Sequence, residues 1–178
     1  MMKKVLTTTV LVFVLVFATG YHAYSQISQG GTPPSFIERT ISQDIEVRSF
    51  PAPDVKALLA EDEEDNHGAR PLRAGKIIPV NVDISKAGTW TDLPGQGKIW
   101  RIKLKSEGAL AFGVYFNWFY LPEGGELYLY NQSKDFVIGA FTNFNNDESG
   151  SFATELIPGD EVILEYYSPD RKSTRLNS

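Results

Sequence analysis

The feature that most constrains the fold is an alternation of apolar and polar residues that begins at Lys76 and continues almost to the end of the chain. In residues 78–84 isoleucine and valine alternate with proline, asparagine and aspartate, and in 100–105 Trp, Ile and Leu alternate with Arg and Lys. A period of two is typical of a β-strand with one buried face. Pro79 cannot donate to a ladder, so we expect strand 78–84 at a sheet edge.

Four further stretches have the composition of strands, and turn residues separate them: 110–116, 126–130, 136–141 and 161–167. The stretch 110–116 is apolar on both sides of the alternation, which predicts a central strand under a second layer. Within the last stretch, Glu165 lies between Leu164 and Tyr166, so we expect its side chain to point outward. Closely spaced short strands with almost no helical periodicity predict an all-β chain, an antiparallel β-sandwich of jelly-roll type. We place this sandwich in residues 76–169.

One short helical signal precedes the strands. Pro53 suits a first helical turn, and the apolar residues at 55, 58 and 59 share one helical face, so residues 53–75 should hold a short helix and an acidic loop. The five acids of 61–65 lack the ligand spacing of a calcium loop and are interpreted as a solvated charge run. Residues 26–52 open with the Gly- and Pro-rich QISQGGTPP, which predicts a flexible lead-in.

Residues 1–25 have the pattern of a secretory signal peptide. Lys3 and Lys4 precede an apolar run, and the small residues Ala23 and Ser25 precede a cleavage site between Ser25 and Gln26. An uncleaved anchor is the alternative, but the run is shorter than the roughly 20 residues that span a bilayer. We therefore expect a secreted protein, periplasmic or extracellular, with no stable membrane span after cleavage.

Residues 170–178, DRKSTRLNS, resemble the translation of a sequencing-library adapter; a native basic tail or the start of a linker is the alternative. On the adapter interpretation the natural protein continues past Pro169, and the tail carries no function. Without the two ends, 12 basic and 21 acidic residues remain, a net charge of −9. Such a charge disfavours nucleic acid and anionic membrane surfaces as partners.

Composition excludes several kinds of reactive site. The chain has no cysteine, which removes disulfides, thiolate catalysis and cysteine-ligated metals, and it has only two histidines, His22 and His67. Ser149 and Ser151 lie in a polar segment without a companion histidine, so a serine-hydrolase triad is not expected. No glycine pair fits a phosphate-binding loop. We predict no catalytic, metal-binding or cofactor-binding residues and no cofactor in this segment.

Carboxylates are the next candidates, because a glycosidase needs two of them facing each other. The sequence offers Asp83, Asp92, Glu155 and Glu165 but gives no reason to bring any two together, and a structural or surface role is expected for all four.

Two arginines, Arg70 and Arg73, lie in an expected loop. They serve there either as surface charges or as a processing site.

Aromatic side chains cluster in residues 112–120, with members Phe112, Tyr115, Phe116, Trp118, Phe119 and Tyr120. If they are exposed, such residues stack on sugars or form an interface; otherwise they pack the core and sheet faces. Trp90 and Trp100 flank a turn, and we expect them to close one end of the core. The sequence leaves both interpretations of the cluster open.

A set of short motifs also resembles a known family, in this order: GGTPPSF at 30–36, PDV at 53–55, GTW at 88–90, IWR at 99–101, LP at 121–122, LYLYN at 127–131, GAFT at 139–142, GD at 159–160 and EYY at 165–167. In their order these motifs resemble the N-terminal propeptide-like domain of secreted, trypsin-like serine protease precursors of the lysyl endopeptidase type in Bacteroidetes.

The resemblance implies that a protease domain with a His/Asp/Ser triad follows in the precursor and is the partner of this domain. This chain stops before such a domain, so the resemblance assigns no catalytic residue to it. The implied role is that of a β-rich pro-region, an inhibitor or folding aid for a secreted endopeptidase that cuts after lysine. The alternative is a free-standing secreted β-sandwich that binds carbohydrate or a cell surface.

Overall fold

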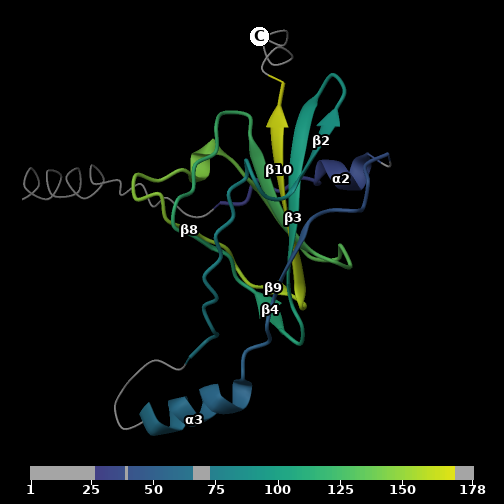
Figure 1. Ribbon diagram of the computed structural model, residues 1–178. Coiled ribbons are helices and arrows are strands. Elements are labelled where there is room, and N and C mark those ends of the chain that lie inside the picture. The colour runs from purple at the N-terminus through teal and green to yellow at the C-terminus, as the bar shows by residue number, and fades with distance from the viewer. Residues whose placement is uncertain (1–26, 39, 66–72, 171–178) are drawn as a thin grey trace, which may run out of the picture.

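A computed structural model describes residues 27–38, 40–65 and 73–170 (Figure 1). The predicted signal peptide with its cleavage site, both histidines, Arg70 and residues 171–178 lie outside the described residues. The described part is predominantly β, as the alternation predicted. Its main element is a six-stranded sheet in the order β1-β3-β10-β6-β7, with β2 also paired to β3.

The sheet consists of β1 (Val47–Phe50), β2 (Thr89–Leu93), β3 (Gly97–Ser106), β6 (Glu126–Asn131), β7 (Val137–Phe141) and β10 (Glu161–Pro169). All its pairs are antiparallel except β1 with β3. Two small ladders pair β4 (Ala111–Phe112) with β9 (Ile157–Pro158) and β5 (Tyr115–Phe116) with β8 (Phe152–Ala153). The helices are α2 (Pro34–Ile37), α3 (Val55–Asp65) and a 3-10 turn at Asn143–Asn145.

One face of the sheet carries the main hydrophobic core. Its side chains come from alternate positions of the three central strands: Trp100, Ile102, Leu104, Leu127, Leu129, Val162 and Leu164. The small ladders and adjoining loops cover this face with Phe119, Phe152 and Ile157, and the rings of Phe119 and Phe152 stack with centroids 4.3 Å apart. Burial of these apolar surfaces is the main source of stability in this half of the molecule.

The other face is covered by residues 27–38 and 40–46, here named the cover segment. Ile45 and Phe36 pack with Tyr130 and other residues of this face. The backbone of the segment also bonds to the sheet, since the amide of Gln29 donates to the carbonyl of Ala140 at 2.9 Å and the amide of Ala140 donates to Gly30 at 2.8 Å. The sequence predicted a flexible lead-in over 26–52; the cover segment within it packs against the sheet, through its apolar residues and these backbone hydrogen bonds.

Helix α3 forms where the helical signal predicted one, but it continues through the acidic run, which is therefore helical rather than a loop. Arg73 pairs with two of these acids, its Nη2 lying 2.9 Å from Glu61 and its Nε 2.8 Å from Asp62. The helix lies apart from the sheet (Figure 1), and its apolar residues Val55 and Leu59 are exposed. No helix in the described ranges has the length and apolar character to cross a membrane.

Two strand predictions were wrong. Residues 78–84 form no ladder and are largely exposed; Val82 packs partly buried against the main core, but no strand pairs with the stretch. Residues 110–116 do not form one central strand but two short peripheral ones, β4 and β5, and Leu110 is 92% exposed. By contrast, the predictions at 100–105, 126–130, 136–141 and 161–167 correspond to β3, β6, β7 and β10.

Candidate functional site

The serines considered as nucleophiles lie in an exposed turn. The amide of Ser149 donates to the carboxylate of Asp147 at 2.8 Å, and the amide of Ser151 donates to the Ser149 hydroxyl at 3.1 Å. Both serines serve the turn's own backbone, a common use of Asp and Ser in loops. No base is shown bonded to either hydroxyl in the part of the chain that the structure describes.

The four carboxylates singled out in the sequence do not meet. Asp83 accepts bonds from Ser85, and the hydroxyl and amide of that serine, together with the Lys86 ammonium, lower the pKa of Asp83 to about 2. Asp92 and Glu155 are exposed on other elements. Among residues 27–38, 40–65 and 73–170 no group of three or more His, Asp or Glu side chains is arranged to hold a metal ion.

Glu165 was expected to point to solvent, and this was wrong: it is 0% exposed. Its carboxylate accepts from the Ser35 amide at 2.8 Å, the Ser35 hydroxyl at 2.5 Å and the Tyr130 hydroxyl at 2.8 Å. The side chain does alternate away from Leu164 as predicted, but the cover segment closes over that face. Three hydrogen bonds therefore satisfy both oxygens of this buried side chain.

Arg101 lies directly across the β3–β10 ladder from Glu165 and is 2% exposed. Its Nη2 donates to the carbonyl of Ser42 at 2.6 Å, so the guanidinium bonds to the cover segment. Burial first, and then the nearby Glu165 carboxylate, raises the pKa of Tyr130 well above its usual value of 10. These groups form a buried polar cluster that holds the cover segment on the sheet.

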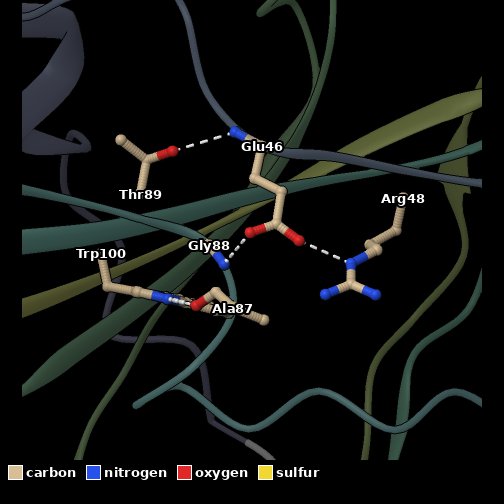
Figure 2. Close-up of polar contacts among 6 residues, drawn as sticks. All are labelled: Glu46, Arg48, Ala87, Gly88, Thr89 and Trp100. Carbon is tan, nitrogen blue, oxygen red and sulfur yellow. Dashed lines mark hydrogen bonds and ion pairs between the residues drawn. The ribbon is translucent and has the colours of Figure 1, made fainter.

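A second polar contact holds the start of β1 against the turn before β2 (Figure 2). The Glu46 amide donates to the Thr89 hydroxyl at 2.9 Å, while the Glu46 carboxylate accepts from the Gly88 amide and from Arg48 Nε, both at 2.6 Å. The Gly88 amide, and then Arg48, lower the pKa of Glu46 below its usual 4.5. Both oxygens of the Glu46 carboxylate therefore accept structural hydrogen bonds.

Of the two tryptophans expected to close one end of the core, Trp100 is buried in the main core, whereas Trp90, opposite it across the ladder, is 40% exposed. The indole of Trp100 donates to the carbonyl of Ala87 at 2.6 Å (Figure 2). At Gly88 the φ angle is +81°, and a Cβ there would lie 2.2 Å from Trp100 Nε1, so the turn requires glycine.

The aromatic cluster divides between core and surface. Phe119 is buried and Phe112 and Phe116 are partly buried, whereas Tyr115, Trp118 and Tyr120 are 68%, 78% and 67% exposed. In residues 110–120 and 144–156, Leu110, Phe144 and Leu156 are also exposed, at 92%, 77% and 62%. We name these six residues the exposed apolar surface. Side chains of this kind, exposed together, mark interaction sites.

Hydrogen bonds bring the two stretches that carry this surface side by side. The amide of Phe119 donates to the carbonyl of Gly150 at 2.7 Å, and a Cβ at Gly150 would lie 2.9 Å from the Trp118 ring. Asn146 accepts from the Leu121 amide and donates to the Leu121 carbonyl, both at 2.8 Å. The 110–120 stretch therefore lies along 144–158, and these hydrogen bonds fix the backbone that carries the exposed rings.

No protein-family model matches the chain, and no solved structure matches it at a significant level. The site is therefore defined by its geometry. Sequence reasoning singled out the aromatic residues of 112–120 but not Phe144, Leu110 or Leu156. It missed the polar cluster around Glu165, for which the one available signal was a carboxylate between two apolar residues of a strand.

Proposed function

We propose that this chain is the non-catalytic pro-region of an exported serine endopeptidase precursor of the lysyl endopeptidase type. In this proposal the N-terminal signal directs it to the periplasm or beyond, and the sheet with its covering ladders is a sandwich of jelly-roll type. The partner is the protease domain encoded after Pro169. The proposal rests on the ordered motifs of residues 30–167 and on the geometry of the exposed apolar surface.

The observation that carries the proposal is the exposure of Trp118 and Tyr120 on a scaffold whose polar groups are engaged elsewhere. Tryptophan and tyrosine are the residues most often found at energetically dominant contacts in protein interfaces. The carboxylate of Glu165 and that of Glu46 are used in internal hydrogen bonds rather than offered to a substrate. A domain of this kind acts by binding another molecule. A pro-region acts in this way, because it binds its own protease domain.

The test begins with the coding sequence beyond Pro169, which should encode a trypsin-like domain in the same frame. The mature protease is then assayed on a lysyl amide substrate with increasing amounts of the exported chain. We expect inhibition that Trp118→Ala weakens at least tenfold, about 1.4 kcal/mol. Trp90→Ala, a partly exposed indole outside the surface, is the matched control and should leave inhibition unchanged. A downstream frame without a protease domain would refute the proposal.

The second candidate function is carbohydrate binding, which the same exposed rings favour because aromatic faces stack on sugars. A glycan array probed with the exported chain tests it directly. Binding that Tyr120→Ala abolishes, together with no inhibition of any downstream protease, would favour this function over the pro-region. Blank arrays with inhibition of the protease would exclude it.

A further inference from the structure

We propose that a small pocket beside the buried polar cluster binds a carboxylate. The pocket encloses about 60 Å³ and lies between the cover segment and the sheet. Its lining residues are Gln43, Ile45, Arg101, Lys103, Tyr130, Gln132, Lys134 and Ile163. This site lies on the sheet face opposite the main core, and it does not depend on the proposed function.

Arg101 supplies the observation that points to a ligand. Its side chain is 2% exposed, and its Nε–H is a buried donor with no hydrogen-bond partner among the described residues. Its Nη2 is already used by the carbonyl of Ser42. A buried donor without a partner is unfavourable, and guanidinium donors match carboxylate oxygens in geometry. The same residue lines the pocket, and the proposal places a ligand oxygen beside this unpaired donor.

The charges around the pocket favour an anion. Three cations line it, those of Arg101, Lys103 and Lys134. Two carboxylates lie beside them: Glu165, across the ladder from Arg101, and Glu161, which is shared between Lys103 at 3.0 Å and Lys105 at 2.6 Å. The cations therefore outnumber the carboxylates.

The volume of the pocket also suits a carboxylate. A water molecule needs roughly 10–15 Å³ of such space, so the pocket has room for about four waters or one carboxylate group with its first carbon. The buried residues Ile163 and Tyr130 form the closed side, and the exposed residues Gln43, Gln132 and Lys134 stand at the mouth. Lys134 Nζ lies 3.5 Å from the Gln43 side-chain oxygen and 4.9 Å from the centre of the Phe36 ring. The ligand therefore enters past an ammonium group.

The experiment uses the chain without residues 1–25, labelled with ¹⁵N, and follows the Arg101 Nε–H resonance. Sodium acetate, inorganic phosphate and a blocked tripeptide with a central glutamate are titrated separately, with sodium chloride holding ionic strength constant. We expect a saturable shift with acetate at millimolar concentration. A shift with the tripeptide as well assigns the carboxylate to a protein side chain, whereas acetate alone assigns it to a small free acid.

Variants connect the shift to the pocket. Lys134→Gln removes the charge at the mouth and should weaken acetate binding about two- to fivefold, the range for an exposed ion pair. Lys86→Gln removes a lysine whose side chain is 81% exposed and lies outside the pocket, and it should change nothing. Both are surface changes, and the spectra themselves report that the fold is intact. No saturable shift, a shift that chloride reproduces, binding of phosphate but not acetate, or equal effects of both variants would overturn the proposal.

Discussion

Removal of the Tyr130 hydroxyl should destabilise the protein by about 2 kcal/mol, because it deletes a hydrogen bond to a buried carboxylate. The bond to Glu165 is 2.8 Å long, and both residues are almost fully buried. Hydrogen bonds to charged groups contribute roughly 1.5–3 kcal/mol. Tyr130→Phe leaves Glu165 with its two bonds from Ser35, so we expect the middle of that range. Glu165→Gln replaces one oxygen that accepts from Ser35 and Tyr130 with an NH2 group, so it should cost at least as much.

The assay is urea unfolding of the protein at pH 7. With a denaturant slope of about 2 kcal/mol per molar, Tyr130→Phe should lower the midpoint by about 1 M. Tyr166→Phe is the matched control, since this tyrosine is on the opposite face of the sheet and donates no side-chain hydrogen bond in the described part. It should change stability by less than about 0.5 kcal/mol.

Hydrogen exchange locates the effect. Because Ser35 bonds to Glu165 through its amide, that amide should exchange faster in Tyr130→Phe, together with the Gln29 amide of the cover segment. Amides in the middle of β3 should keep their relative protection. Equal midpoints for Tyr130→Phe and Tyr166→Phe would refute the reasoning, as would a Glu165→Gln protein as stable as the wild type.

Three further outcomes follow from the contacts described. The two lysine partners of Glu161 lower its pKa below the usual 4.5, so their stabilisation is present above pH 4.5 and is lost as the pH falls; the midpoint difference between wild type and Glu161→Gln should shrink between pH 6 and pH 3. Gly88→Ala should cost at least about 2 kcal/mol more in urea unfolding than Gly95→Ala, because both have positive φ but a Cβ clashes only at Gly88. Leu59→Ala on exposed α3 should cost less than about 0.5 kcal/mol in thermal unfolding, whereas Leu129→Ala, 0% exposed, should cost about 2–5 kcal/mol.

The strands that the sequence predicted correctly are those whose alternation reflects a buried face. In β10 the side chains of Val162 and Leu164 enter one core while Ile163 and Glu165 face the cover segment. The period of two is a local property, so it can be recognised without knowing the neighbours. Residues 78–84 have the same period but no partner strand, which shows that alternation alone does not establish pairing.

The cover segment and the polar cluster could not be predicted, because both depend on contacts between residues far apart in the chain. Ser35 and Glu165 are 130 residues apart, and nothing near Ser35 indicates a buried carboxylate. Glycine and proline in residues 30–34 predicted flexibility, yet such residues also allow a chain to lie flat against a sheet. For the aromatic cluster, the sequence identified the residue types but not their exposure, which the peripheral positions of β4 and β5 determine.

The measurement that tests the functional proposal most directly is hydrogen–deuterium exchange of this protein, alone and mixed with the protease domain that the proposal places after Pro169. We predict slower exchange in residues 110–120 and 144–156, which carry the exposed apolar surface, and unchanged exchange in residues 76–86. Identical exchange in both samples, or protection confined to α3, would contradict the proposal that this surface covers the enzyme.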